Sequence, residues 1–97
     1  MGDPLQEIYQ HNPNIVSRLI AGEMILVPIR KNMGDLENIY TLNETAARVW
    51  ELMDGQRTLA DVHQQIVNEF DIDPLQAEQD LLELLENLLE EGALVKV

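Results

Sequence analysis

The chain has 97 residues, enough for one domain around one hydrophobic core. It contains no Cys, which excludes disulfides and thiolate metal sites, and no apolar run approaches the ~20 residues of a membrane-spanning helix. The net charge is −12, and the span from Thr58 to Val95 holds ten acidic residues without one Lys or Arg. Such a surface repels nucleic-acid backbones and anionic lipid; it either attracts a basic partner or only aids solubility.

The N-terminal half predicts a loose segment followed by a small sheet. Residues 1–14 combine two prolines with mixed polar residues, and we expect a flexible arm there, followed by one domain over residues 15–97. Ile15 to Ala21 and Met24 to Ile29 are rich in β-branched and apolar residues around a glycine turn, which predicts a hairpin. Ile39 to Leu42 predicts a short third strand, so the simplest sheet is an antiparallel meander with that strand at an edge.

Three helices are predicted next, each beginning at a residue that can cap it. Asn43, the pair Thr58 and Asp61, and Asp73 before Pro74 are the expected N-terminal caps. Glycines end the first and third helices. The expected helices are therefore Glu44–Met53, residues 59–70 and residues 74–91, with a short terminal strand from Leu94. This order predicts an α+β fold, winged helix-turn-helix-like, with a three-stranded antiparallel sheet followed by three helices.

The third helix carries more leucine than one core requires. At about 100° per residue its apolar positions cover half of the helical circumference, whereas a helix on one core needs a stripe of only ~100°. The half with Ala77, Leu81, Leu84 and Leu88 would suffice for the core. The spare edge is a second apolar surface, a buried edge or a dimer seam, and it consists of Leu75, Leu82 and Leu89, flanked by Gln79 and Glu86.

No pattern for catalysis is visible in the sequence. Ser17 has no His placed beside it by spacing, and His11 and His63 are far apart. Metal-ligand spacings and glycine-rich phosphate loops are absent from the sequence. We therefore expect a protein that is not an enzyme and that uses neither a metal nor a cofactor.

The sequence favours peptide binding over DNA binding. A third helix without Lys or Arg disfavours DNA binding, because phosphate repulsion would go uncompensated. The edge strand, by contrast, offers unpaired backbone groups to which an extended guest peptide can add. Apolar guest side chains would then rest on the spare leucine edge, and nearby acidic residues would favour a guest with Lys or Arg.

Three segments resemble the PqqD family. Residues 40–55, Tyr-Thr-Leu-Asn-Glu-Thr-Ala-Ala-Arg-Val-Trp-Glu-Leu-Met-Asp-Gly, are similar to its strand-to-helix signature. Residues 58–62, Thr-Leu-Ala-Asp-Val, resemble the start of its second helix. Residues 78–94 resemble its last helix and the residues that follow that helix. The resemblance covers about residues 15–97, whereas residues 1–14 match nothing in the family.

The resemblance implies a noncatalytic recognition element for ribosomally made peptides. Such proteins bind the leader of a precursor peptide as an added strand between the third strand and the third helix. They present it to a modifying enzyme, often a radical S-adenosylmethionine enzyme, as in the synthesis of pyrroloquinoline quinone. Carried over to this chain, the edge strand is Ile39, Tyr40 and Thr41, and the helix wall is the spare edge of Leu75, Gln79, Leu82, Glu86 and Leu89.

The expected partners are thus a precursor peptide and its modifying enzyme, in the cytoplasm, with neither nucleic acid nor membrane. A cytoplasmic location also fits an N-terminus without the basic and apolar segments of a secretory signal. The alternative is a regulatory winged-helix module that binds protein or DNA. A third reading is an oligomer, such as a homodimer, whose leucine edge is a self-interface.

Overall fold

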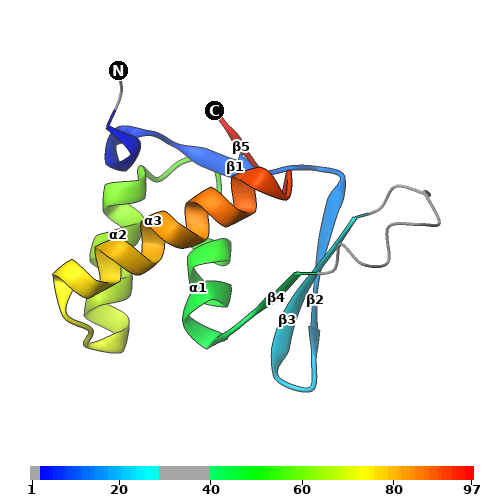
Figure 1. Ribbon diagram of the computed structural model, residues 1–97, viewed down its shortest axis with the longest axis horizontal. Helices are drawn as coiled ribbons and strands as arrows, with labels where there is room; N and C mark the ends of the chain where they lie inside the picture. The colour runs from blue at the N-terminus through cyan, green and yellow to red at the C-terminus, as the bar shows by residue number, and fades with distance from the viewer. Residues whose placement is uncertain (1–2, 29–39) are drawn as a thin grey trace.

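The computed structural model describes residues 3–28 and 40–97, and its main sheet has three antiparallel strands. β2 (Ile15–Ile20), β3 (Glu23–Pro28) and β4 (Tyr40–Leu42) lie in the order β2-β3-β4 (Figure 1). The hairpin and the short third strand were both predicted, although Ile39 lies outside the described residues. β4 lies at one edge of this sheet, as the meander requires.

Three helices follow the sheet: α1 (Glu44–Leu52), α2 (Leu59–Phe70) and α3 (Pro74–Glu90). Together with the sheet they confirm the predicted fold class. The predicted caps are present, because Asn43 Oδ1 accepts from the Ala46 N–H at 2.8 Å and Asp73 accepts from the N–H of Gln76 at 3.1 Å. Thr58 and Asp61 form a complete capping box at the start of α2. Over the described residues, no helix combines the length and the apolar character needed to cross a bilayer.

The core lies where α1 meets the other two helices and the sheet. Its largest fully buried side chains include Trp50 of α1, Leu26 of β3 and Leu88 of α3. At its edge the ring of His11 stacks on Trp50 with centroids 3.7 Å apart, and His11 Nε2 donates to the Trp50 carbonyl oxygen at 2.6 Å. The only Trp of the sequence is therefore a central core residue, as its position in the first helix predicted.

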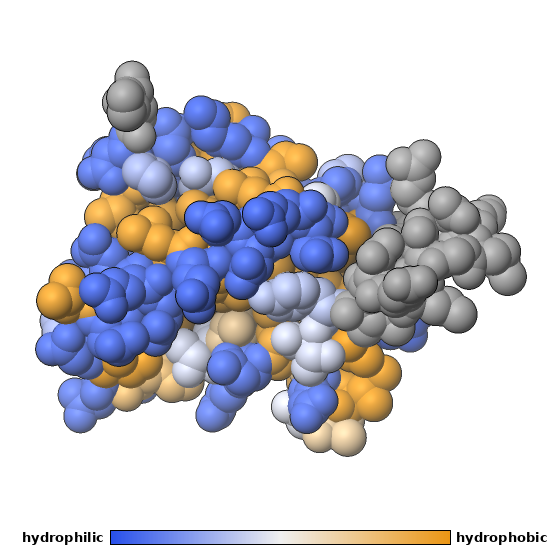
Figure 2. Space-filling model, viewed as in Figure 1, coloured by the Kyte–Doolittle hydropathy of each residue, from blue (hydrophilic) through white to orange (hydrophobic). Residues whose placement is uncertain are grey.

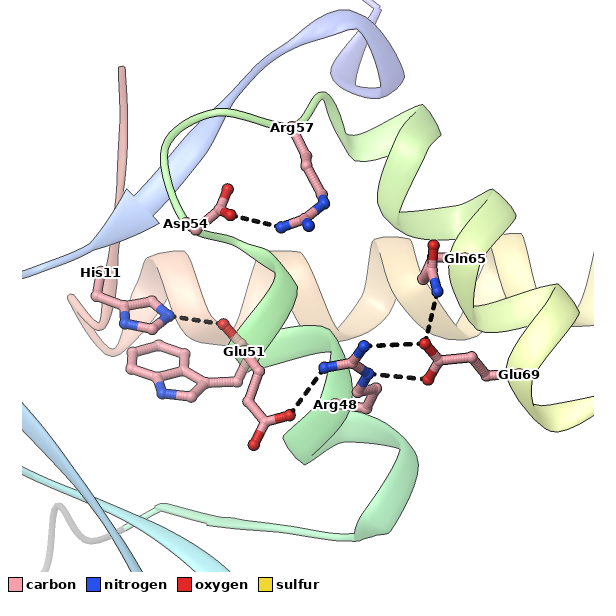
Figure 3. Close-up of polar contacts among 8 residues, drawn as sticks. His11, Arg48, Glu51, Asp54, Arg57, Gln65 and Glu69 are labelled. Carbon is pink, nitrogen blue, oxygen red and sulfur yellow. Dashed lines mark hydrogen bonds and ion pairs between the residues drawn. The ribbon is translucent and has the colours of Figure 1, made fainter.

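The helices α1 and α2 are also joined on their outer side by an ion-pair network (Figure 3). Arg48 donates to both carboxylate oxygens of Glu69 at 2.8 and 2.9 Å, and to Glu51 at 3.1 Å. Gln65 adds a bond to Glu69 at 2.6 Å. This network fixes the outer faces of the two helices whose inner faces support the core.

The N-terminal segment differs from the flexible arm that we predicted. Within the described residues 3–14 there is a 3-10 turn, η1 (Pro4–Gln6), and a strand, β1 (Tyr9–His11), which pairs with the C-terminal strand β5 (Leu94–Lys96). Tyr9 is buried, and its carbonyl oxygen accepts from the N–H of Gly55 at 3.0 Å. Pairing with a strand from the other end of the chain holds the segment, and that partner could not be read from local composition.

Candidate functional site

A groove of about 430 Å³ lies between the edge strand β4 and helix α3. Its floor is apolar and includes Ala46 and Val49 of α1, Ile66 of α2 and Leu81 and Leu84 of α3. Asp80, Glu83 and Asn87 add polar side chains along the α3 rim, and Tyr40 and Thr41 form the β4 rim. On this face of the molecule, α3 presents a band of hydrophilic side chains (Figure 2). The groove therefore combines an apolar floor with a polar rim beside a strand edge.

Local hydrogen bonds fix the elements around the groove. Asn43 and Thr45 line it where α1 begins, and the capping bond of Asn43 sets the sharp turn from β4 into α1. His63 of α2 also lines it, and its Nε2 donates to the Pro74 carbonyl oxygen at 2.8 Å. That bond holds the start of α3 against α2. The groove thus lies among elements that are held by caps and a cross-helix hydrogen bond.

The register of the sheet shows which backbone groups of β4 face outward. Ala21 and Gly22 form a two-residue turn with positive φ at both positions, the geometry of a type I′ hairpin, so Ile20 and Glu23 are a hydrogen-bonded pair. Hydrogen-bonded and non-hydrogen-bonded positions alternate along antiparallel strands, so the bonds of Met24 and Leu26 face β4.

It follows that Leu42 and Tyr40, the partners of Met24 and Leu26, use their backbone groups within the sheet. Thr41 between them directs its N–H and C=O to the open edge. Across the described residues no strand pairs with that edge. Thr41 can therefore exchange two hydrogen bonds with an added strand, and the side chains flanking the paired guest residue would lie on the same sheet face as Tyr40 and Leu42.

The structure brings only part of the predicted peptide site to this groove. Tyr40 is half-buried and Thr41 exposed, and both line it, whereas Ile39 lies outside the described residues. None of the five predicted residues of α3 is among its lining residues. Leu75 is 65 % and Leu89 41 % exposed, Gln79 and Glu86 are exposed, and Leu82 is half-buried against the core. The two rims of the groove thus come from β4 and from a different face of α3.

The two flanks of α3 explain the difference. Ala77, Leu81, Leu85 and Leu88 are buried and form its centre line. At about 100° per residue, Leu84 lies about 200° around the helix from Leu82, so the groove and the spare leucine edge are on different sides of that line. Sequence reasoning assigned Leu84 to the core and overlooked Asp80, Glu83 and Asn87. The spacing of Asp80, Leu84 and Asn87 at i, i+4 and i+7 was the signal available for this flank.

The polar side chains that line the groove come from β4 and from all three helices. Within residues 3–28 and 40–97, no three His, Cys, Asp or Glu side chains are grouped so that they could hold a metal ion. Two shifted pKa values belong to residues elsewhere. Burial, and then the charge of Glu7, raises the pKa of Tyr9. A backbone hydrogen bond from Gln56, together with the charge of Arg57, lowers the pKa of Asp54. Neither residue lines the groove.

Comparisons with known proteins give a family match and two similar solved structures. The family model for coenzyme PQQ synthesis protein D (PqqD) matches residues 23–94, which include β4 and α3. A solved structure of lasso peptide synthetase B1 complexed with the leader peptide is 26 % identical, with a TM-score of 0.74 over 90 % of this chain and 96 % of that chain. A structure of TbiB1 in complex with the TbiA(beta) leader peptide is 22 % identical, with a TM-score of 0.71 over 88 % and 93 %. No curated protein matches the chain in sequence.

Proposed function

The chain belongs to the PqqD family, and from this membership we propose that it is a noncatalytic adaptor that binds the leader of a ribosomally made precursor peptide. The observation that carries the proposal is the open edge of β4 beside the groove. A guest strand would exchange backbone hydrogen bonds with Thr41, which give affinity for any extended peptide, while alternate guest side chains enter the groove and give specificity.

Two neighbours in structure support the ligand class. Lasso peptide synthetase B1 and TbiB1 are both described in complex with leader peptides, and this chain shares their fold over most of its length. The family description adds a link to the synthesis of pyrroloquinoline quinone. A precursor leader is thus the ligand class common to the neighbours, and it is the one we assign to the groove.

The adaptor would present the bound peptide to a modifying enzyme in the cytoplasm, where ribosomes make the precursor. The PqqD resemblance favours a radical S-adenosylmethionine enzyme and a quinone-type pathway. The name of the lasso peptide synthetase neighbour favours a lasso peptide precursor as the second candidate. Pull-down of each class of enzyme by the adaptor, with and without the cognate precursor, would distinguish the two.

A proline at the open edge tests strand addition directly. Thr41→Pro removes an N–H that faces outward, so the bonds between β3 and β4 remain while a guest strand loses a donor. We expect binding of a leader encoded beside this chain's gene to fall at least tenfold by calorimetry. Ser17→Pro is the matched control, because the same alternation directs the Ser17 N–H to the opposite open edge, on β2.

NMR would locate the bound peptide. With the unmodified chain, amide shifts should change in β4 and in the part of α3 from Asp80 to Asn87. Equal weakening by Thr41→Pro and Ser17→Pro would exclude addition at β4. If encoded leaders cause no shifts and the chain binds duplex DNA tightly at physiological salt, the alternative of a regulatory module that binds protein or DNA is supported. Sedimentation across concentrations tests the homodimer, which the proposal leaves open.

A further inference from the structure

We propose that the groove selects a leader segment in which a Lys or Arg lies two residues from an apolar side chain. This specificity rests on the proposed function, because it assumes that the guest adds to β4. In a guest strand the residue opposite Thr41 points away from α3, and its two neighbours point to the groove side. These neighbours are about 7 Å apart along the strand, so they can meet different parts of the groove.

The apolar half of the pattern follows from the floor. Ala46, Val49 and Leu84 line the groove, and Leu84 is half-buried. An apolar guest side chain placed over Leu84 would remove the remaining exposed apolar surface of that leucine from water, which favours binding. A polar side chain at the same place would lose its hydration without a partner on this floor.

The cationic half of the pattern follows from the rim. Asp80 and Glu83 lie one turn apart along the rim that α3 contributes, and both are exposed. Asp80 accepts one hydrogen bond from Gln76 at 3.0 Å, which leaves its second oxygen available to a guest. A Lys or Arg stem can cover the apolar wall while its charged end reaches these carboxylates.

The basic residues that the structure describes do not neutralise this rim. Arg48 pairs with Glu69 and Glu51, Arg57 with Asp54 and Lys96 with Glu7. Arg18 belongs to β2, and the register places it on the sheet face of Ile25 and Thr41, opposite to the face of Tyr40 and Leu42, and it is not among the lining residues of the groove. The negative potential at the rim is therefore not cancelled by these four side chains, and it opposes an acidic guest as much as it favours a basic one.

A randomised decapeptide library displayed on phage tests this pattern without knowledge of the natural leader. We expect the selected peptides to show Lys or Arg at one position and an aliphatic or aromatic residue two positions away. The double variant Asp80→Asn/Glu83→Gln should keep the apolar preference and lose the basic one. Synthetic copies of a selected peptide should bind this variant about three- to tenfold more weakly, with a weaker dependence on salt.

The matched control is Glu90→Gln/Glu91→Gln, which removes the same charge from the C-terminal end of α3, outside the groove lining. It should leave the basic preference intact. Enriched peptides without a basic preference, or equal effects of the two double variants, would overturn the specificity while leaving peptide binding in place. If the library yields no peptide that depends on Thr41, the proposed function itself fails. Circular dichroism confirms that each variant is folded.

Discussion

The carboxylate of Glu69 shows how one residue couples helix packing to pH. The hydrogen bonds from Arg48, and then from Gln65, lower the pKa of Glu69 from 4.5 to about 2. The hydrogen bonds to Glu69, and then to Glu51, raise the pKa of Arg48, which stays charged throughout the pH range in which Glu69 titrates. Because the folded pKa lies below the unfolded value, ionised Glu69 stabilises the fold above about pH 4.5, and this contribution is lost as the pH falls towards 2.

We therefore predict that Glu69→Gln lowers the free energy of unfolding at neutral pH and that its difference from the unmodified chain shrinks below pH 4.5. Urea unfolding followed by Trp50 fluorescence at pH 7, 4 and 3 measures both curves. The effect should be small, because the ion pair is partly exposed. Parallel curves across this range would show that the Arg48 contact does not stabilise the folded state.

Substitutions at Leu84 and Leu89 test which flank of α3 contacts the peptide. Leu84 lines the groove beside β4, whereas Leu89 is 41 % exposed on the spare leucine edge. Leu84→Gln should weaken binding of a leader peptide about tenfold, since the apolar contact of one guest side chain is lost. Leu89→Gln should change the dissociation constant less than twofold. The reverse result would favour the wall expected from the helical wheel, with Leu75, Leu82 and Leu89.

At the scale of elements, β1 is part of the fold. Tyr9 is buried in the core. The two residues before it accept backbone hydrogen bonds: the Glu7 carbonyl oxygen from the N–H of Leu59 at 2.9 Å, and the Ile8 carbonyl oxygen from the N–H of Val97 at 2.9 Å. Tyr9→Ala should lower the free energy of unfolding by about 2–4 kcal/mol, because a buried aromatic side chain is removed from the core. Chemical denaturation measures this loss.

Deletion of residues 1–11 tests how much the whole N-terminal segment contributes to stability. It removes β1 and leaves β5 unpaired, so the unfolding midpoint in urea should fall further than with Tyr9→Ala alone. Deletion of residues 1–3 is the control, because the hydrogen bonds that the structure gives to Asp3 come from the N–H groups of Leu5 and Gln6 within η1, so β1 and its pairing with β5 are kept. A truncated chain as stable as the full one would support the boundary expected from composition, with a domain that begins at residue 15.

The elements differ in how far the sequence predicts them. The capped helices and the hairpin follow from signals within a few residues, such as Asn43 at a helix start and Gly22 in a tight turn. β1 does not, because its strand character depends on β5, some 85 positions later in the chain. The groove wall could not be fixed from the sequence for a related reason: the helical wheel of α3 identifies two candidate flanks, and only the packing of α1 and α2 shows which one lines the groove beside β4.

For the whole molecule, charge separates peptide capture from DNA binding. The net charge is −12, and the groove rim on α3 carries Asp80 and Glu83. α3 contains no Lys or Arg, so insertion of this helix into a DNA groove would bring carboxylates towards phosphates without the counterion release that drives such binding. The same field attracts a cationic peptide and speeds its association.

We predict that fluorescence anisotropy detects no binding of a labelled 20-base-pair duplex at about 0.15 M salt, where exposed charges are screened beyond ~8 Å. A leader peptide with a basic residue should bind under the same conditions, and its association rate should fall as salt is added, because the attraction acts mainly before contact. Duplex binding that weakens steeply with salt would instead reveal a cationic surface outside α3. That result would support the alternative of a regulatory module, since the acidic rim beside β4 cannot produce salt-dependent binding of a duplex.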